Sequence, residues 1–109
     1  VGATNTTNVT QSAYGTTGAI IVIDLTGSGN TPTVSQSGLY DHYASLDVTG
    51  SSNTITLAQS GGAGTGHSAT MEVIGSSNTI SATQQGSVSN LLNMKVTGSS
   101  NSYTIIQKN

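Results

Sequence analysis

Apolar and polar residues alternate along much of this chain, and the alternation restarts at regular intervals. From Thr54 to Leu57 and from Thr79 to Ala82, apolar residues take every second position, and Thr or Ser stands between them. Such alternation is typical of a β-strand with one buried and one exposed face. The pattern therefore predicts an all-β chain of short, half-buried strands.

The first kind of alternating segment occurs five times. Each copy has an Asn just before the segment, a Gln six residues later and a Gly three residues earlier. The spacing between copies is 25, 23, 25 and 23 residues, so the sequence predicts one repeat domain, 1–109, with units 2–26, 27–49, 50–74, 75–97 and 98–109. The Asn column is Asn5, Asn30, Asn53, Asn78 and Asn101, and the Gln column is Gln11, Gln36, Gln59, Gln84 and Gln107.

A second alternating segment precedes each new glycine. Its apolar positions form three columns, and its polar positions include one charged column. The apolar columns are Ile21/Ala44/Ala69/Leu92, Ile23/Leu46/Met71/Met94 and Leu25/Val48/Val73/Val96, and the charged column is Asp24/Asp47/Glu72/Lys95. Each of the first four repeat units therefore holds two strands that are separated by glycine-rich turns, and the fifth holds the first strand.

Two short strands in every unit of 23 or 25 residues predict a β-solenoid of about four and a half two-stranded coils. Equivalent strands of successive coils would pair, which gives two parallel, in-register sheets. Coils that stack at a strand spacing of about 4.8 Å would form a block roughly 22 Å tall.

The Asn and Gln columns share the parity of the apolar residues, so both are predicted to point into the core. A buried amide is normally costly, but in a repeat each amide can bond to its copy in the next coil. We therefore expect two amide ladders along the solenoid axis, in place of a thick apolar core.

The motif also resembles the curlin repeat, the unit of bacterial curli fibre subunits, with its pattern Ser-x5-Gln-x-Gly-x2-Asn-x5-Gln. The Gln-x-Gly corner is present at Gln36-Ser37-Gly38, Gln59-Ser60-Gly61 and Gln84-Gln85-Gly86. It is absent at Gln11 and Gln107, and the family's closing Gln column is apolar in the second strand. The resemblance implies a diverged curli-like subunit of an extracellular fibre.

The ends of such a solenoid suggest the same function. Open strand edges pair with other chains unless they are capped or charged, and the last strand, 102–107, is apolar and followed only by Lys108. We expect a head-to-tail homo-oligomer, because a contact that joins unlike ends does not close. The residues predicted to stack between subunits are Thr6, Asn8, Val9, Gln11, Tyr103, Ile105 and Gln107.

Two alternatives stay open. The exposed Thr columns of the first strand resemble the flat arrays of ice-binding solenoids, although Thr is also favoured on any exposed strand. An adhesive shaft of a phage or cell-surface protein would instead use the segment 39–43, where Tyr40, His42 and Tyr43 could contact a glycan.

Other classes of function find little support. Charged residues are 6% of the chain, the net charge is −2, and the longest apolar run is too short for a bilayer, so we expect neither a nucleic-acid nor a membrane partner. We expect no enzyme, catalytic residue or cofactor, since Asp41 and His42 would face opposite sides of a strand. His42 and His67 share a column, but no third ligand aligns with them, so a stacked pair is favoured over a metal site.

Overall fold

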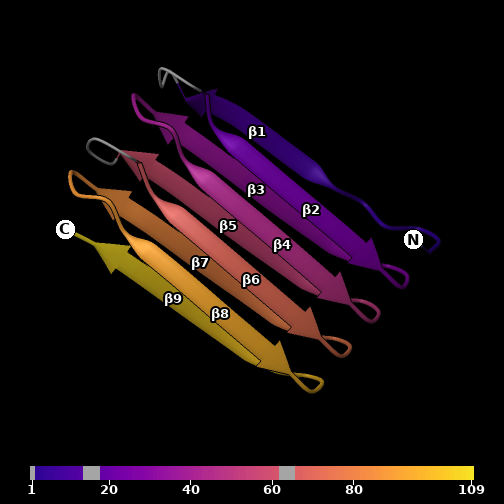
Figure 1. The fold of residues 1–109 in the computed structure, drawn as a ribbon. Helices are drawn as coiled ribbons and strands as arrows, with labels where there is room; N and C mark the ends of the chain where they lie inside the picture. Colours follow the sequence, from indigo (N-terminus) through magenta and orange to yellow (C-terminus); the bar gives the residue numbers. More distant parts are fainter. Residues whose placement is uncertain (1, 14–17, 62–65) are drawn as a thin grey trace.

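The strands of the chain alternate between two stacked sheets (Figure 1). The structure is a computed structural model that describes residues 2–13, 18–61 and 66–109. The five-strand sheet contains β1 (Asn8–Ala13), β3 (Thr31–Gly38), β5 (Thr54–Gly61), β7 (Thr79–Gly86) and β9 (Ser102–Lys108). The four-strand sheet contains β2 (Ile20–Thr26), β4 (Tyr43–Thr49), β6 (Ser68–Ile74) and β8 (Leu91–Thr97).

All strand pairs are parallel and keep the register of the sequence repeat. Gln36 pairs with Gln59 and Gln59 with Gln84 in the five-strand sheet. In the four-strand sheet, Leu46 pairs with Met71. The predicted β-solenoid of two parallel, in-register sheets is therefore confirmed, and equal residues stack because equal residues recur at the period of one coil.

The core lies between the two sheets and is built from the inward side chains of both. The burial of β5 alternates as the sequence predicts, with Ile55, Leu57 and Gln59 inside and the Thr residues between them outside. Opposite them lie Leu46, Met71 and their column neighbours from the four-strand sheet. The described residues include no helix long and apolar enough to cross a membrane.

The tight corner before each strand of the five-strand sheet has a fixed backbone conformation. Its glycine has a φ of +132° at Gly50 and at Gly75, and the residue before the Asn is left-handed, with φ of +58° at Ser52 and Ser77. Backbone bonds link these corners along the axis, for example from the Ser52 N–H to the Ser28 carbonyl at 2.9 Å. The Gly-x-x-Asn motif is thus a stacked turn, not merely a linker.

Pro32 explains why β1 begins later in its repeat than β3 does. The Thr31 N–H donates toward the following coil, to the Asn53 carbonyl at 2.8 Å. Neighbouring N–H groups along a strand point to opposite sides, so the donor that proline lacks is the one that would face the first coil. The strand pairing between the first two coils accordingly starts at Asn8 and Thr33.

Candidate functional site

The Asn column forms a continuous ladder that also holds the corners together. Asn53 Nδ2 donates to Asn30 Oδ1 at 3.0 Å and to the Gly75 carbonyl at 2.8 Å, and Asn53 is fully buried. The Asn78 backbone N–H and Nδ2 both donate to Asn53 Oδ1, at 3.0 Å each. One side chain therefore joins three consecutive coils.

The Gln column forms a second ladder near the opposite end of the same strands. Gln36 Nε2 donates to Gln59 Oε1, and Gln59 Nε2 donates to Gln84 Oε1, both at 2.8 Å. Each Nε2 also donates to a carbonyl of the facing sheet, as Gln59 does to Tyr43 at 3.0 Å. No buried side-chain nitrogen or oxygen in the described part of the chain lacks a partner.

The two ladders run in opposite directions. Gln amides donate toward the C-terminal coil, whereas Asn amides donate to the side-chain oxygen of the N-terminal neighbour. At the C-terminal end, Gln107 and Asn101 are consequently the last rungs, and at the N-terminal end, Gln11 and Asn5 are the first. The C-terminal end therefore offers a Gln amide donor and an Asn side-chain oxygen. The N-terminal end offers a Gln side-chain oxygen and an Asn amide donor.

The residues predicted to stack between subunits lie on the two terminal strands or beside them. Val9 is 46% exposed and Tyr103 is 42% exposed, whereas Leu57 and Ile80, which lie in the same two columns, are buried. The structure places the predicted stacking set on the outer rims of the five-strand sheet, on or next to β1 and β9. This set comprises Thr6, Asn8, Val9, Gln11, Tyr103, Ile105 and Gln107.

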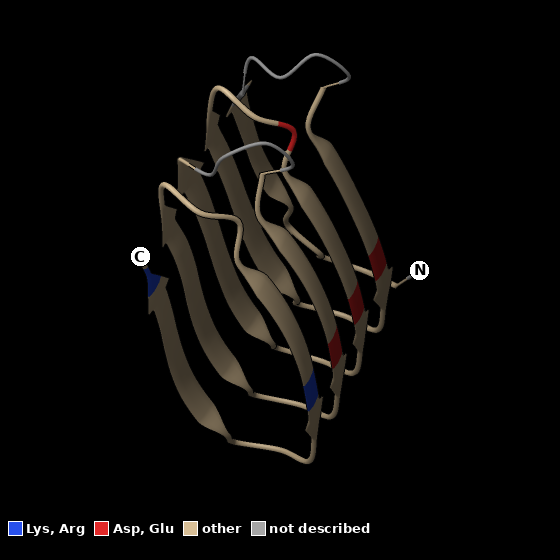
Figure 2. Cartoon of the chain, turned by 60° about the vertical axis from the view of Figure 1, so that its left-hand side comes forward, with Lys and Arg blue, Asp and Glu red and all other residues tan. Residues whose placement is uncertain are grey.

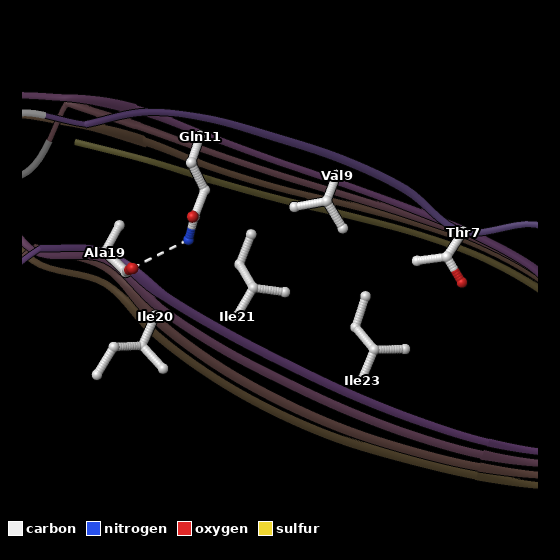
Figure 3. Close-up of a pocket in the computed structure, with 7 residues that line it drawn as sticks. All are labelled: Thr7, Val9, Gln11, Ala19, Ile20, Ile21 and Ile23. Atoms are coloured by element: carbon white, nitrogen blue, oxygen red, sulfur yellow. Dashed lines mark hydrogen bonds between the residues drawn. The ribbon is translucent and has the colours of Figure 1, made fainter.

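The N-terminal end holds an open recess of about 480 Å³ between β1 and β2 (Figure 3). Its lining is mostly apolar, and Gln11 Nε2 donates across it to the Ala19 carbonyl at 3.0 Å. The Ile21 and Ile23 side chains point into it. The full lining is Thr7, Val9, Gln11, Ala19, Ile20, Ile21 and Ile23.

The two histidines stack inside the solenoid, as the sequence predicts. The His42 and His67 rings lie 5.2 Å apart and are inclined by 15°. The His67 backbone N–H donates to His42 Nδ1 at 3.0 Å, so this nitrogen carries a lone pair. His42 Nε2 therefore carries the hydrogen and donates to the Ser37 carbonyl at 2.9 Å.

This arrangement makes the fold sensitive to acid. Burial lowers the pKa of His42 below its ordinary value of 6.5, and the nearby His67 acts in the same direction against the Ser37 bond and Asp41. The unfolded chain then takes up a proton at higher pH than the folded chain does. The contribution of His42 to the free energy of unfolding is complete above its pKa in the unfolded chain. It is lost as the pH falls through the lower pKa of His42 in the folded chain.

We therefore expect a lower free energy of unfolding at pH 5 than at pH 8, measured by urea denaturation. The double variant His42→Asn/His67→Asn should lose this difference, because Asn does not titrate in this range. The column accommodates Asn, since Asn90 already occupies it. An equal pH dependence in the double variant would show that other groups cause it.

The segment that was predicted to contact a glycan is only partly accessible. His42 is 1% exposed and bonded through both ring nitrogens, so including it as a contact residue was wrong. Tyr43 is 40% exposed and Tyr40 is half-buried. Asp41 Oδ1 accepts from the Gly18 N–H at 2.9 Å and thus links two neighbouring loops.

Four of the six charged residues form a row across the strands of the four-strand sheet (Figure 2). Asp24 pairs with Asp47, Asp47 with Glu72, and Glu72 with Lys95, whose Nζ lies 3.2 Å from Glu72 Oε1. Both members of this ion pair are exposed, so it adds little stability. Nowhere in the described ranges do three or more His, Cys, Asp or Glu side chains gather as a metal site would require.

No protein-family model matches the chain, and no curated protein matches it either.

One part of the end surfaces was not singled out from the sequence, namely the corner glycines. A Cβ on Gly75 would overlap the Gly98 carbonyl of the next coil. Gly98 has the same kind of backbone, with φ of +122°, but a Cβ there would meet only Asn101 Nδ2, at 3.2 Å. The sequence does show a Gly at this position in every repeat unit. A tight turn alone would also explain that Gly, so the close contact between corners of successive coils was not predicted.

Proposed function

We propose that this chain is the structural subunit of a self-assembling extracellular filament that is curli-like in its repeat and stacks head to tail. The observation that carries the proposal is the complementarity of the two ends. Both end in unpaired strands of the same sheets, and each presents the hydrogen-bonding groups that the other lacks.

The end-to-end contact continues the two amide ladders. Gln107 Nε2 would donate to Gln11 Oε1 of the next subunit, as Gln84 Nε2 donates to Gln107 Oε1 at 2.9 Å. The Asn5 backbone N–H and Nδ2 of that subunit would donate to Asn101 Oδ1, as those of Asn101 do to Asn78 Oδ1. Each new bond repeats one that the subunit already makes internally.

The backbone supports the same register. Residues 2–5 already have the corner conformation, with φ of +139° at Gly2 and +57° at Thr4, although no described strand precedes them. This corner would stack on residues 98–101 as the other corners stack on one another. The terminal strand β9 would then pair with β1 of the next subunit, a form of β-strand addition.

The edges carry few of the features that prevent such pairing. Lys108 is the one charged residue on β1 or β9, and Pro32 lies in the second coil rather than on an edge strand. Unprotected edges of this length normally promote association. The resemblance to curlin repeats and the low content of charged residues fit an extracellular fibre of cross-β type.

Electron microscopy of the purified chain after incubation at micromolar concentration tests the proposal. In such a filament each subunit adds five strands to the five-strand sheet. We therefore expect a subunit rise of about 24 Å and a layer line near 4.8 Å. This rise exceeds the roughly 22 Å height expected from the sequence, since stacking through the five-strand sheet adds half a coil per subunit. A chain that stays monomeric would contradict the proposal.

The variant Gly98→Ala is expected to remain folded yet to form at least tenfold less filament. Its methyl group would meet the Gly2 carbonyl of an incoming subunit, as a Cβ on Gly75 would meet Gly98. Within the subunit the substitution adds backbone strain of about 1–3 kcal/mol and a close contact of 3.2 Å with Asn101 Nδ2. Circular dichroism checks the fold, and sedimentation measures the filament.

A second variant attacks the other end. Val9→Pro removes a backbone N–H that faces away from β3, because the Thr6 N–H donates toward the second coil and donors alternate. It should also block assembly, while Val9→Thr, which keeps the N–H, should assemble. Filaments of normal yield from both Gly98→Ala and Val9→Pro would refute this stacking.

A second candidate function is binding to a flat ordered surface such as ice. Exposed Thr31, Thr54 and Thr79 lie in register on the outer face of the five-strand sheet, and Thr31 Oγ1 donates to Thr54 Oγ1 at 3.2 Å. Inhibition of ice recrystallisation by a monomeric chain would favour this function.

A further inference from the structure

Exposed apolar side chains gather on the outer face of the four-strand sheet. Of the ten large apolar side chains that are exposed in the described residues, this face carries five, namely Ile20, Val22, Tyr43, Ile74 and Leu91. The outer face of the five-strand sheet carries one, Ile106. Single exposed apolar residues are common on any surface, but a group of them on one face marks a contact surface.

Three of these five side chains belong to one column, and their sizes follow a definite order. The strands pair in register, so that from β2 to β8 this column reads Ile20, Tyr43, Ser68 and Leu91. Ser68 therefore leaves a gap between two large side chains, Tyr43 and Leu91. Ile20 is 53% exposed and Leu91 is 71% exposed, so the column is open to a partner.

The charged row on the same face also has a direction (Figure 2). From β2 to β8 it reads Asp24, Asp47, Glu72 and Lys95, so its cation stands at the β8 end and an acid stands at the β2 end. A partner that presents the same row in reverse order would place its Lys95 opposite Asp24. Both the column and the row are therefore complementary to their own reverse.

We propose that this face binds a second copy of the chain, related by a two-fold axis that runs along the strands between β4 and β6. The rotation reverses the order of the strands, so Tyr43 of each copy faces the gap at Ser68 of the other. Ile20 of each copy likewise faces Leu91 of the other, and Asp24 faces Lys95. A two-fold contact forms each of these pairs twice.

The other face-to-face arrangement has its two-fold axis along the solenoid and fits less well. It reverses the direction of the strands and keeps their order, so Lys95 would lie opposite Asn93 rather than an acid. The apolar column would face the opposite end of each strand, which carries Thr26, Thr49, Ile74 and Thr97. The sizes and the charges therefore favour the axis along the strands.

The face is small, so two single copies pair weakly. Its four strands of seven residues cover about 23 by 19 Å, or roughly 440 Å², whereas a stable interface buries about 800 Å² on each partner. The row of three carboxylates and one ammonium group also gives each face a charge of −2. We therefore expect pairing at high protein concentration, and more of it at high salt, which screens this repulsion.

Cross-linking through one introduced cysteine tests the pairing, because the chain has no cysteine of its own. Ser45→Cys places a thiol near the centre of the face, one strand away from the same thiol of the second copy. A bis-maleimide that spans about 10 Å, the spacing of packed sheets, should link the two chains. Thr56→Cys, exposed on the five-strand sheet, is the matched control and should give at least tenfold less linked dimer.

This contact uses a face rather than an end, so it goes beyond the proposed function and does not depend on it. Equivalent residues of subunits stacked head to tail would lie about 24 Å apart, beyond the reach of the cross-linker. Dimers linked through Ser45→Cys therefore report on the face alone.

Exchanging the large and the small side chain of the column tests the register. In the Ser45→Cys chain, Ser68→Tyr would set Tyr against Tyr across the two-fold axis and should lower the yield of linked dimer at least tenfold. Tyr43→Ser/Ser68→Tyr should restore the yield, because the reversed column again places a Tyr opposite a Ser. Circular dichroism checks that each variant remains folded.

Exchanging the charges tests the same register at the ends of the row. Lys95→Glu would set Glu against Asp24 of the other copy and should lower the yield of linked dimer. Asp24→Lys/Lys95→Glu should restore it, because the cation and the acid have changed places. The ion pair between Lys95 and Glu72 is lost in both variants, and its exposure means that the fold hardly depends on it.

Restoration by both exchanges would support the pairing. A yield from Ser45→Cys no higher than that from Thr56→Cys would overturn it and leave the face to a different partner. Linked dimers that either exchange fails to restore would overturn it as well, since the face would then associate without this register. None of these results bears on whether filaments form, so the two proposals are tested separately.

Discussion

Replacing Gly50 by alanine is expected to lower the free energy of unfolding by about 4 kcal/mol or more, which is a large fraction of the stability of a small domain. A Cβ at this position would overlap the carbonyl oxygen of Gly75 in the next coil. The position of the Cβ is fixed by its own backbone and the carbonyl belongs to the backbone of the next coil, so no side-chain rotation relieves the overlap. The corners would have to separate, and the Gly75 N–H bond to the Thr49 carbonyl, now 2.9 Å, would be lost.

Two other glycines divide this effect into its causes. Gly98→Ala has a similar backbone and no carbonyl of another coil near its Cβ, so it should show the cost of the φ angle and of a 3.2 Å contact with Asn101 Nδ2. Gly18→Ala, with a φ of +89° and no atom within 4 Å of its Cβ, should show the cost of the φ angle alone. If urea denaturation gave Gly50→Ala and Gly98→Ala equal losses of stability, contact between corners would not be the reason for the conserved spacing.

Asn53→Ala should be the second most damaging change, with an expected loss of about 3–5 kcal/mol. The Gly75 carbonyl loses its amide donor and the Asn78 N–H loses its acceptor, both in the interior. Each buried polar group left without a partner costs about 1–3 kcal/mol, and a small cavity adds to this cost. Thermal and urea unfolding of the purified variant would measure the loss.

The matched control for this change is Asn5→Ala at the start of the same ladder. Asn5 is half-buried and bonds only to the second coil, through Gly27 and the Asn30 N–H. Its loss should cost about 1 kcal/mol, because water can reach the groups that it leaves behind. Equal losses at Asn5 and Asn53 would mean that position within the ladder is unimportant and that the amides act locally.

The sequence was sufficient for the fold because each residue type recurs in one structural position. The period placed Gln59 beside Gln36 and Gln84 and made all of them inward-facing, and the structure confirms these positions. It also placed His42 on the same column as His67. In a solenoid each repeat unit contacts only the units next to it. Residues in the same column of the repeat alignment therefore contact one another along the axis.

The remaining features depend on the three-dimensional positions of backbone and side-chain groups, which the repeat pattern does not give. The Asn side chains bond to the backbone of the following corner, which only the three-dimensional turn reveals. The late start of β1 depends on which side of the strand the missing donor of Pro32 faces. The described residues give five strands to one sheet and four to the other, and the sequence-based height of the subunit did not take this difference into account.

The hydrogen bonds of both sheets and of both ladders all run along the solenoid axis. Tension applied along a filament would therefore load every bond at a given coil boundary at once, so the boundary with the fewest bonds sets the breaking force. Within the subunit that boundary lies between the first two coils, where Pro32 contributes no donor. Between subunits of the proposed filament, the pairing of β9 with β1 would carry the load through the five-strand sheet.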